Sequence, residues 1–540
     1  MLRITELRLP LNHSDSALRS AVLAKLEISA DALITLSIAR RAADARKRSK
    51  ISLIYSVDVT VTDEAKVLHR FKDDRHVGPT PKSTYHHVAQ APAQLRTRPV
   101  VIGTGPCGLF AGLILAEMGF NPIILERGKI VRERTVDTFA LWRKGKLSPE
   151  SNAQFGEGGA GTFSDGKLYS RIKDPMHRAR KVLTEFVAAG APDEILYVAK
   201  PHIGTFRLVS MVESMRAKME SLGAEIRFQS KVESIDLETH GTERRVVGVT
   251  LADGSTITTP HVVLAVGHSA RDTFQMLFDQ GIYVESKPFS IGVRIEHPQS
   301  MIDRCMYGPS AGNAILGAAD YQLVHHCSNG RAVYSFCMCP GGTVVAATSE
   351  IGRVVTNGMS QYSRAERNAN SGLVVDVTPE RDFPGDALAG IAFQREWESR
   401  AFVVGGSTYN APGQLVGDFL AARPSTAFGS VIPSYKPGVH LTDLAACLPD
   451  YAITAMREAL PAFDRKIKGY AMADAVMTGV ETRTSAPLRI KRDETTLQSI
   501  NTTGLYPAGE GAGYAGGILS AAVDGIKVAE ALARAATGVG

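Results

Sequence analysis

Three glycines, Gly103, Gly105 and Gly108, follow a short apolar run and open a largely apolar stretch. In a strand–turn–helix unit, the first permits a tight turn, the second lets the backbone approach a pyrophosphate, and the third lets the helix pack closely on the sheet. The helix start adds free N–H groups and a partial positive charge that attract phosphates. Glu126 ends the next apolar run, about 20 residues on, where a carboxylate accepts hydrogen bonds from ribose hydroxyls. This spacing predicts a dinucleotide site.

Residues beside these positions extend the expected site. Pro106 and Cys107 begin the helical stretch and Arg127 follows the acid, so we expect all three to contact the dinucleotide. Glu117 is the one polar residue between positions 106 and 118, which is typical of a helix packed against a sheet. The alternatives are a buried glycine-rich helix without a ligand and a membrane span. A span needs about 20 apolar residues without a glycine turn at its start.

A second glycine-rich segment, FGEGGAGTFSDGK, covers residues 155–167. Its closely spaced glycines cannot form a regular element at low conformational cost. Such a loop suits close approach of the backbone to a ligand, although a flexible surface loop is the alternative. The residues that we expect to contact the dinucleotide here are Gly159, Ala160, Gly161 and Thr162.

The C-terminal segment GLYPAGEGAGYAGGI, residues 504–518, indicates which dinucleotide binds. It resembles the last FAD motif of the glutathione-reductase-like flavoproteins, in which a strand ends in Gly-Asp and the next helix points its N-terminus at the flavin. Here the pair is Gly509-Glu510, one methylene longer, and the helix start falls at Gly516, Gly517 and Ile518. A second complete strand–GxGxxG–helix–strand unit is missing from the chain, which favours FAD over NAD as the bound cofactor.

Two further segments, SFCMCPGG (335–342) and GVETRTSAPLRI (479–490), sharpen the resemblance. Together with the segments above, they resemble the bacterial FAD-dependent, or NAD(FAD)-utilising, dehydrogenases over about residues 95 to 540. The resemblance implies a Rossmann-like α/β domain that binds FAD. It also implies that the strand with Val232 lies beside the adenine and that Gly267 ends a strand near the cofactor. The family has no settled substrate, so the resemblance implies a fold and a cofactor but no reaction.

Few side chains are needed for flavin chemistry, because the flavin itself carries the hydride or electrons. Cys337 and Cys339 share one face of an expected strand, so they are candidates for a redox pair or a thiolate nucleophile. The alternative is a pair of inert buried cysteines. The CxxxxC that follows the first FAD motif in disulfide reductases is absent, which argues against that chemistry.

Arg483 and His268 are the other catalytic candidates. Arg483 precedes the last FAD segment and suits an anionic substrate or the flavin pyrimidine edge, or else a structural turn. His268 follows a buried strand and is either a general acid or a packed loop residue. We expect no metal site, because an Asn329-Gly330 turn of two residues keeps His325 and Cys327 away from Cys337 and Cys339.

Length and patterning predict several domains. The fold class that we expect is α/β: a Rossmann-like FAD domain of the glutathione-reductase type, an inserted β-rich substrate domain and a small N-terminal α+β domain. The boundaries are 1–75 for the N-terminal domain, 76–97 for a linker, 98–287 for the first FAD part, 288–473 for the insert and 474–540 for the return.

The N-terminal region carries a basic cluster, which comprises Arg40, Arg41, Arg46, Lys47, Arg48 and Lys50. We expect a helix over Ala30–Arg48, with these cations at its solvated end. The alternative is a contact with RNA or another polyanion, but aromatic residues that would stack on bases do not alternate with the cations.

Composition is that of a globular protein, with a net charge of +6, and it excludes neither small-molecule nor macromolecular partners. Six sparse cysteines, no signal peptide and no membrane span favour a cytoplasmic protein. We therefore expect an FAD-dependent oxidoreductase that transfers a hydride between bound flavin and a small-molecule substrate or NAD(P)H as a transient donor. The alternatives are an RNA-binding or RNA-modifying flavoprotein and a non-catalytic nucleotide-binding protein.

Overall fold

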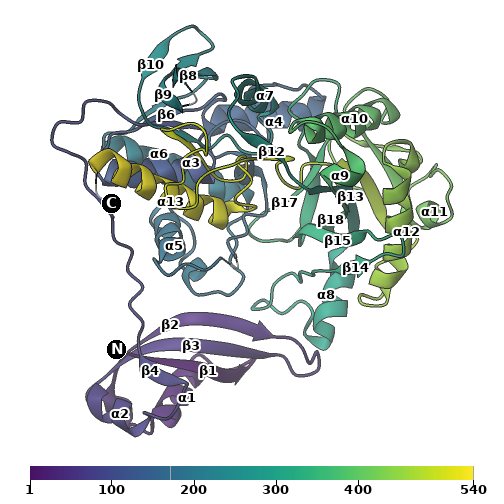
Figure 1. Ribbon diagram of the computed structural model, residues 1–540. Coiled ribbons are helices and arrows are strands. Elements are labelled where there is room, and N and C mark those ends of the chain that lie inside the picture. Colours follow the sequence, from purple (N-terminus) through teal and green to yellow (C-terminus); the bar gives the residue numbers. More distant parts are fainter. Residues whose placement is uncertain (171, 242, 539–540) are drawn as a thin grey trace.

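The computed structural model describes residues 1–170, 172–241 and 243–538, which form a small N-terminal unit and a larger body (Figure 1). The N-terminal unit has a four-stranded antiparallel sheet in the order β2-β3-β1-β4. Its elements are β1 (Leu2–Pro10), α1 (Ala17–Leu26), β2 (Leu33–Asp44), β3 (Ser52–Val61), α2 (Glu64–Arg70) and β4 (Val77–Pro79). Side chains of both helices join those of the sheet in one core.

Two features of this unit differ from the sequence expectation. The region expected as a helix over Ala30–Arg48 is mostly β2, which pairs with β3 from Leu33 opposite Val61 to Asp44 opposite Ser52. The β-branched residues at 34, 35 and 38 favour a strand, and long-range pairing outweighs the helical pattern. Strand β4 pairs with β1 and therefore lies inside the segment 76–97 that we expected to be linker.

The body begins with a five-stranded parallel sheet in the order β23-β11-β5-β6-β7. Its strands are β5 (Val100–Ile102), β6 (Ile123–Leu125), β7 (Glu225–Arg227), β11 (Val262–Leu264) and β23 (Leu505–Pro507). The chain therefore returns at its C-terminal end to the sheet that it began near residue 100. Figure 1 shows the yellow C-terminal helix beside the blue helices of the earlier part of the body. Parallel strands bring their carboxyl ends to one edge, where α/β sheets bind ligands.

Helices α3 (Pro106–Glu117) and α13 (Ile518–Thr537) pack closely together beside this sheet. Residues 107–116 of α3 are all buried. A Cβ on Gly525 of α13 would overlap the carbonyl of Cys107 in α3. Helices α5 (Arg178–Ala188) and α6 (Thr205–Ser221) complete the same core. An apolar helix without a polar face fits this position because it is covered on every side.

Smaller elements link the two halves of the body. A three-stranded antiparallel sheet of β8 (Val232–His240), β9 (Glu243–Leu251) and β10 (Thr256–Thr258) precedes β11. The other elements are α4 (Val131–Lys144), α7 (Arg271–Asp279), and two strand pairs, β12 (Val284–Ser286) with β22 (Leu488–Ile490) and β16 (Gly342–Ala346) with β17 (Thr356–Ser360).

A seven-stranded mixed sheet forms the other half of the body, in the order β14-β15-β18-β13-β21-β19-β20. Its strands are β13 (Phe289–Pro298), β14 (Val324–His326), β15 (Ala332–Cys339), β18 (Asn368–Val377), β19 (Ala411–Leu415), β20 (Val439–Leu441) and β21 (Val476–Glu481). Its helices are α8 (Gln299–Tyr307), α9 (Pro379–Asp382), α10 (Ala389–Val404), α11 (Val416–Leu420) and α12 (Asp450–Asp464). Strand β21 follows the expected boundary at residue 473, so that boundary falls inside this half.

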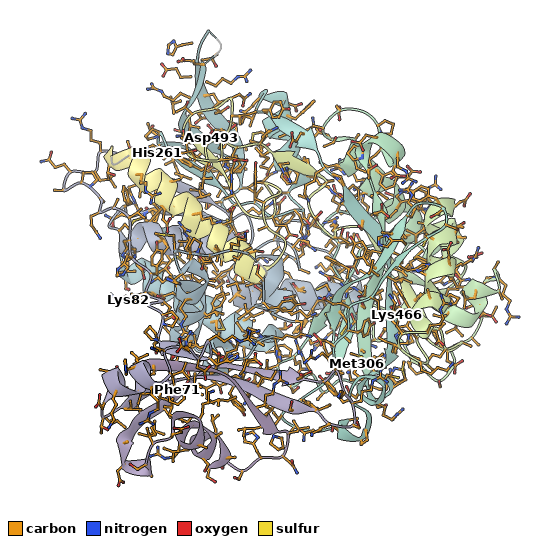
Figure 2. The ribbon with its side chains drawn as sticks, turned by 60° about the horizontal axis from the view of Figure 1, so that its bottom comes forward. Phe71, Lys82, His261, Met306, Lys466 and Asp493 are labelled. Atoms are coloured by element: carbon orange, nitrogen blue, oxygen red, sulfur yellow. The ribbon has the colours of Figure 1, made fainter. Side chains whose placement is uncertain are left out.

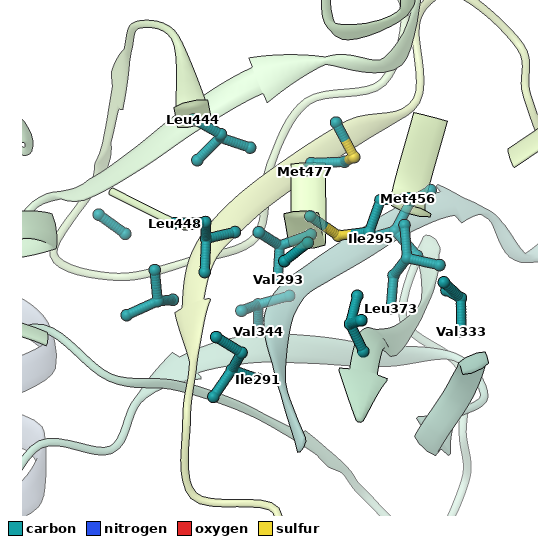
Figure 3. Close-up of a cluster of buried hydrophobic side chains, with 14 of the residues drawn as sticks. Ile291, Val293, Ile295, Val333, Val344, Leu373, Leu444, Leu448, Met456 and Met477 are labelled. Atoms are coloured by element: carbon teal, nitrogen blue, oxygen red, sulfur yellow. The ribbon is translucent and has the colours of Figure 1, made fainter. Parts of the chain in front are cut away.

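The core of this half lies between the sheet and its helices (Figure 3). Ile291, Val293 and Ile295 alternate along β13 and share one face, because successive side chains of a strand point to opposite sides. Leu373 of β18 and Met456 of α12 belong to the same buried cluster.

The N-terminal unit contacts the body along β2 (Figure 2 shows the unit below the body, with Phe71 and Met306 labelled). The Arg41 N–H donates to the Tyr197 carbonyl at 2.7 Å, and the Ala199 N–H donates to the Arg41 carbonyl at 2.9 Å. Among the helices of the described residues, none combines the length and hydrophobicity that crossing a membrane requires.

Candidate functional site

The turn from β5 into α3 has the shape that its glycines predicted. Gly103 has φ of +102°, and a Cβ there would overlap the Ala265 carbonyl. A Cβ on Gly108 would overlap the Gly103 carbonyl, so this glycine lets the helix start close to the turn. Gly105 precedes the helix with extended backbone and N–H groups that α3 leaves free. The turn therefore presents bare backbone and a helix N-terminus to a ligand.

The second glycine loop packs directly against this turn. A Cβ on Gly159, where φ is +62°, would lie 2.7 Å from the Cα of Gly105. A Cβ on Gly161 would lie 3.1 Å from Cγ1 of Ile518, the first residue of α13. Three segments that are far apart in the sequence thus meet at one place with little side-chain bulk between them.

A single cavity of about 900 Å³ runs along these segments and reaches the seven-stranded sheet, which is called the second sheet below. Most of the residues that we expected to bind the cofactor line it: Gly103, Gly105, Pro106, Cys107, Glu126, Arg127, Gly159, Ala160, Gly161, Val232, Gly267, Glu510, Gly516, Gly517 and Ile518. Of the catalytic candidates, Cys337, Arg483 and His268 line it as well.

Four expected site residues do not line the cavity. Gly108 and Gly509 lie beneath the cavity lining. Gly108 lets α3 pack closely against the turn at Gly103, and the Gly509 N–H donates to Asp524 at 2.8 Å. Thr162 is 1% exposed and lies against Gly158. Cys339 is fully buried. Sequence spacing alone did not distinguish the residues that line the cavity from the residues that support them from behind.

Glu126 has a fuller set of partners than its expected ribose contacts. One carboxylate oxygen accepts from the Thr104 N–H at 3.0 Å and its hydroxyl at 2.6 Å. The other accepts from the N–H groups of Gly128 at 2.9 Å and Gly156 at 3.0 Å. Four donors occupy the acceptor positions of a carboxylate. The structure therefore gives Glu126 a task that the sequence did not indicate, which is to join the two glycine loops.

Charged side chains surround the cavity near Glu126 and Val232. Both terminal nitrogens of Arg127 donate to Asp272 at 2.8 Å, and its guanidinium lies 4.2 Å from the ring of Phe155. Lys231 pairs with the same Asp272 at 2.9 Å. These contacts fix the Arg127 side chain at the mouth of the turn, and Asp272 is a partner that sequence spacing could not identify.

The C-terminal segment supplies an acid and a helix start to the same cavity. Gly516 and Gly517 precede α13, whose first N–H groups are free of intrahelical partners. Burial raises the pKa of Glu510 to about 7, although nearby Lys287 opposes the shift. Glu510 and Lys287 both line the cavity. Positive potential from a helix N-terminus and a lysine thus faces the same space as the acid.

The far end of the cavity holds a group of polar residues, most of them from the half of the body that contains the seven-stranded sheet. Cys337 and Asn357 reach it from β15 and β17, Glu481 from β21, and Lys167 from the second glycine loop. Fully buried Arg294 donates to Glu481 at 2.8 Å and to the Cys337 carbonyl at 2.9 Å. Burial raises the pKa of Glu481 to about 7 despite this pairing. Lys167 and Glu481 lie in segments that carry the resemblance to flavoproteins, but no pattern in the sequence indicated a role for either residue.

Arg483 and His268 are held in a network rather than free for substrate. Arg483 donates to Ser269 at 3.0 Å and to Ser349 at 2.7 Å, and it pairs with Glu398 at 3.1 Å. Burial, with the nearby arginines, lowers the pKa of His268 to about 3, so its imidazole is neutral near pH 7. A neutral ring is a poor general acid. The contacts of Arg483 favour its structural alternative.

His325 and Cys327 lie apart from Cys337 and Cys339, as expected. The length of the turn differs from the expectation, and His325 and Cys327 have a neighbour that was not expected. Cys327 lies opposite Arg331, so the turn has one residue more than expected. His325 and Cys327 instead approach Glu458 of α12, within 4.8 Å of one another. Glu458 accepts from the Ser328 hydroxyl at 2.6 Å, and burial raises the pKa of Cys327 to about 11. Hydrogen bonds with a protonated thiol account for this group.

The basic cluster of the N-terminal unit lies on β2 and the turn after it, rather than at a helix end. Arg46 pairs with Asp44 at 2.5 Å and Arg41 with Glu194 at 3.8 Å. These acids neutralise part of the positive charge of the cluster, which argues against the RNA alternative.

Comparison with known proteins agrees with this site. Residues 288–484 match the family described as FAD-dependent protein, C-terminal domain-like, and residues 147–310 match flavin containing amine oxidoreductase. Residues 1–60 match a domain of unknown function. An uncharacterized protein of Clostridium beijerinckii is 49% identical over 531 residues, which is 98% of this chain and 98% of that protein.

Solved structures are more distant. CtdE in complex with FAD is 11% identical, with 81% of this chain and 83% of that chain covered and a TM-score of 0.33. THI4 of Thermovibrio ammonificans is 21% identical, with 35% of this chain covered and a TM-score of 0.25; the match spans 64% of that chain.

The matched domains and the cavity define an FAD-dependent oxidoreductase. Within that class, the chain belongs to the same family as the Clostridium beijerinckii protein, which it matches over almost its whole length.

Proposed function

We propose that this protein is a cytoplasmic FAD-dependent dehydrogenase with the two-domain arrangement of glutathione-reductase-like flavoproteins. In this proposal, a hydride passes between the bound flavin and a small-molecule substrate, with NAD(P)H as a transient donor. The observation that carries the proposal is the single cavity, which joins a phosphate-binding turn to a polar group on a second sheet. Six free thiols fit a reducing compartment.

The residues present fit FAD. The bare backbone at Gly105 and Gly159 leaves a channel in which a Cβ from Gly105 would meet only Gly159, at 3.8 Å. We assign the pyrophosphate to this channel and to the N-terminus of α3. Arg127 and Val232 would border the adenosine half, and the start of α13 with Glu510 would face the flavin half. When bound, FAD supplies the two-electron chemistry.

The protein itself would orient the substrate and the cofactor and would stabilise charge on them. Free N–H groups at the start of α13 would stabilise negative charge on the reduced ring. Lys167, Asn357 and Glu481 would contact the substrate, because they line the cavity on the side of the second sheet. Glu481, with its pKa near 7, can hold or release a proton at neutral pH.

Purification of the full chain tests the proposal. The protein should be yellow, and the flavin released by denaturation should have the mass of FAD. Under anaerobic conditions NADH or NADPH should bleach the visible flavin band. If the protein carries no flavin and takes up none on reconstitution with FAD, the proposal is wrong.

A further inference from the structure

Cys337 and Cys339 place two thiols in different surroundings at the far end of the cavity. Cys337 is exposed to the cavity, whereas Cys339 is fully buried. The backbone at Cys337 is left-handed, with φ of +42°, and the pairing of β15 with β18 shifts register between Phe336 and Cys339. Such a bulge re-aims a side chain. Only one of the two thiols is therefore accessible to a ligand in the cavity.

The charges around the pair make the exposed thiol the reactive one. Interaction with the Cys339 thiol, together with the positive charges of Lys167 and Arg294, lowers the pKa of Cys337 well below its ordinary value. The Cys339 thiol donates to the Cys337 carbonyl at 3.3 Å, and its pKa is raised by its partner and by burial. A thiol with a lowered pKa next to a thiol with a raised pKa is the arrangement that favours thiol–disulfide exchange, because the thiolate is the attacking species.

Lys167 and Arg294 also fix the backbone between the two cysteines. The Lys167 ammonium donates to the Met338 carbonyl. Arg294 donates to the Cys337 carbonyl at 2.9 Å. The two cations therefore hold the bulge of β15 in place and also stabilise negative charge on the Cys337 sulfur.

Cys337 lines the same cavity as the segment that we assign to the flavin. Negative charge on Cys337 contributes to the raised pKa of Glu510, which precedes the start of α13. Glu510 and Cys337 line the same cavity from opposite halves of the body.

We propose that Cys337 and Cys339 form a dithiol–disulfide couple that carries two electrons from the bound flavin to a low-molecular-weight disulfide. This inference rests on the proposed binding of FAD. The pair comes from the second sheet, so it does not need the missing CxxxxC of the first helix. The substrate must be small because the cavity of about 900 Å³ also has to hold the cofactor.

The chemistry balances in two stages. The Cys337 thiolate attacks one sulfur of the substrate disulfide and forms a mixed disulfide, releasing the first thiolate. The Cys339 thiol then attacks the Cys337 sulfur, closing the Cys337–Cys339 disulfide and releasing the second half with the proton as a thiol. The Cys337–Cys339 disulfide would return to a thiolate and a thiol on taking up two electrons and one proton, which bound reduced flavin would supply as it is oxidised.

Thiol counting tests the couple without relying on activity. The protein is incubated with glutathione disulfide, freed of it, denatured in iodoacetamide and mapped by mass spectrometry. The wild type should lose alkylation at Cys337 and Cys339 and regain it after reduction. Cys305→Ser, on α8 outside the cavity lining, is the matched control and should behave as the wild type.

Two variants separate the roles of the cysteines. Cys339→Ser should retain half a glutathione disulfide on Cys337, seen as a mass increase, whereas Cys337→Ser should retain none. In anaerobic reductive titration of the oxidised, FAD-loaded proteins, the wild type should take up two electrons per chain more than Cys337→Ser.

The failures are distinguishable. A chain that binds FAD but keeps both thiols alkylated after disulfide treatment overturns the couple and leaves the proposed function intact. A chain that forms the disulfide but takes up no FAD overturns the proposed function and, with it, electron transfer to the pair.

Discussion

At the scale of single residues, the glycines of the two loops matter for the space that they leave. Gly105 has ordinary extended backbone, so a side chain there would not strain the chain. Its Cβ would meet only Gly159, at 3.8 Å. The position therefore separates an effect on the ligand from an effect on the fold, which Gly103 and Gly108 do not.

Gly105→Val should lower the affinity for FAD at least tenfold, about 1.4 kcal/mol, because the added methyl groups enter the channel assigned to the pyrophosphate. Fluorescence titration of the flavin-free protein measures this. Gly78→Val in the N-terminal unit is the control, since a Cβ there meets nothing within 4 Å. Equal FAD affinity of Gly105→Val and the wild type would contradict the assignment.

Glu126→Gln should destabilise the protein by about 1–3 kcal/mol, because one amide NH₂ would face backbone N–H groups and leave them unsatisfied. Denaturation in urea measures the change. Glu150→Gln, whose side chain is 52% exposed, is the control and should cost less than about 1 kcal/mol. Similar small losses in both variants would show that Glu126 does not join the loops as described.

At the scale of elements, a buried ion network joins the two halves of the body. Glu398 of α10 pairs with Arg271 at the start of α7, at 2.6 Å, and with Arg483 after β21, at 3.1 Å. Arg483 also donates to Ser269, which lies between β11 and α7. All of these side chains are buried, so water does not screen the charges. The network therefore holds α10 and the segment after β21 against the segment between β11 and α7.

Glu398→Gln should lower the free energy of unfolding by about 3 kcal/mol, because it removes the buried counter-charge of Arg271 and Arg483 and leaves only the partly exposed Glu350 beside them. Denaturant unfolding measures it. Glu396→Gln on the same helix is the control: Glu396 is 47% exposed and pairs with exposed Arg400, so we expect a loss below about 1 kcal/mol. Equal losses in the two variants would contradict the structural role of the network.

Glu398 also makes the free energy of unfolding depend on pH. Burial alone would raise the pKa of Glu398, but the Arg271 and Arg483 guanidiniums lower it below its usual range. Its contribution to stability is therefore complete above the unfolded pKa of about 4.3 and is lost as the pH falls toward the lower folded value. The acid loss of stability should be smaller in Glu398→Gln than in the wild type when urea unfolding is followed between neutral and acid pH.

At the scale of the whole molecule, the N-terminal unit stands beside the site and does not contribute to it. It has its own hydrophobic core, and the cavity is lined by residues from Ile102 onward. Residues of the segment after it, among them Tyr85 and Leu95, pack on the core around α3.

A chain that starts at Lys82 should therefore bind FAD with unchanged stoichiometry and unfold at a lower temperature, since it loses the contacts of β2 with residues 197–199. Flavin absorbance against protein concentration and thermal unfolding measure both effects, with the full chain as the reference. A folded truncated chain without flavin would show that the N-terminal unit takes part in the site.

The sequence alone determined the glycine turn between β5 and α3, because glycine spacing, helix start and apolar runs are local properties of a short segment. It also indicated that the C-terminal segment returns to the same domain, because the GLYPAGE strand and the helix after it carry their own pattern. It misjudged β2 as a helix, since the pairing with β3 that decides it is not written in local periodicity.

Only the tertiary structure decided which residues meet. The four donors to Glu126, the pairing of Glu398 with two arginines, and the approach of Lys167 and Arg294 to Cys337 join positions far apart in the chain. Spacing could place Cys337 and Cys339 on one strand. The bulge and the charges around it distinguish the exposed Cys337 from the buried Cys339, because pKa and access depend on neighbours in space rather than in sequence.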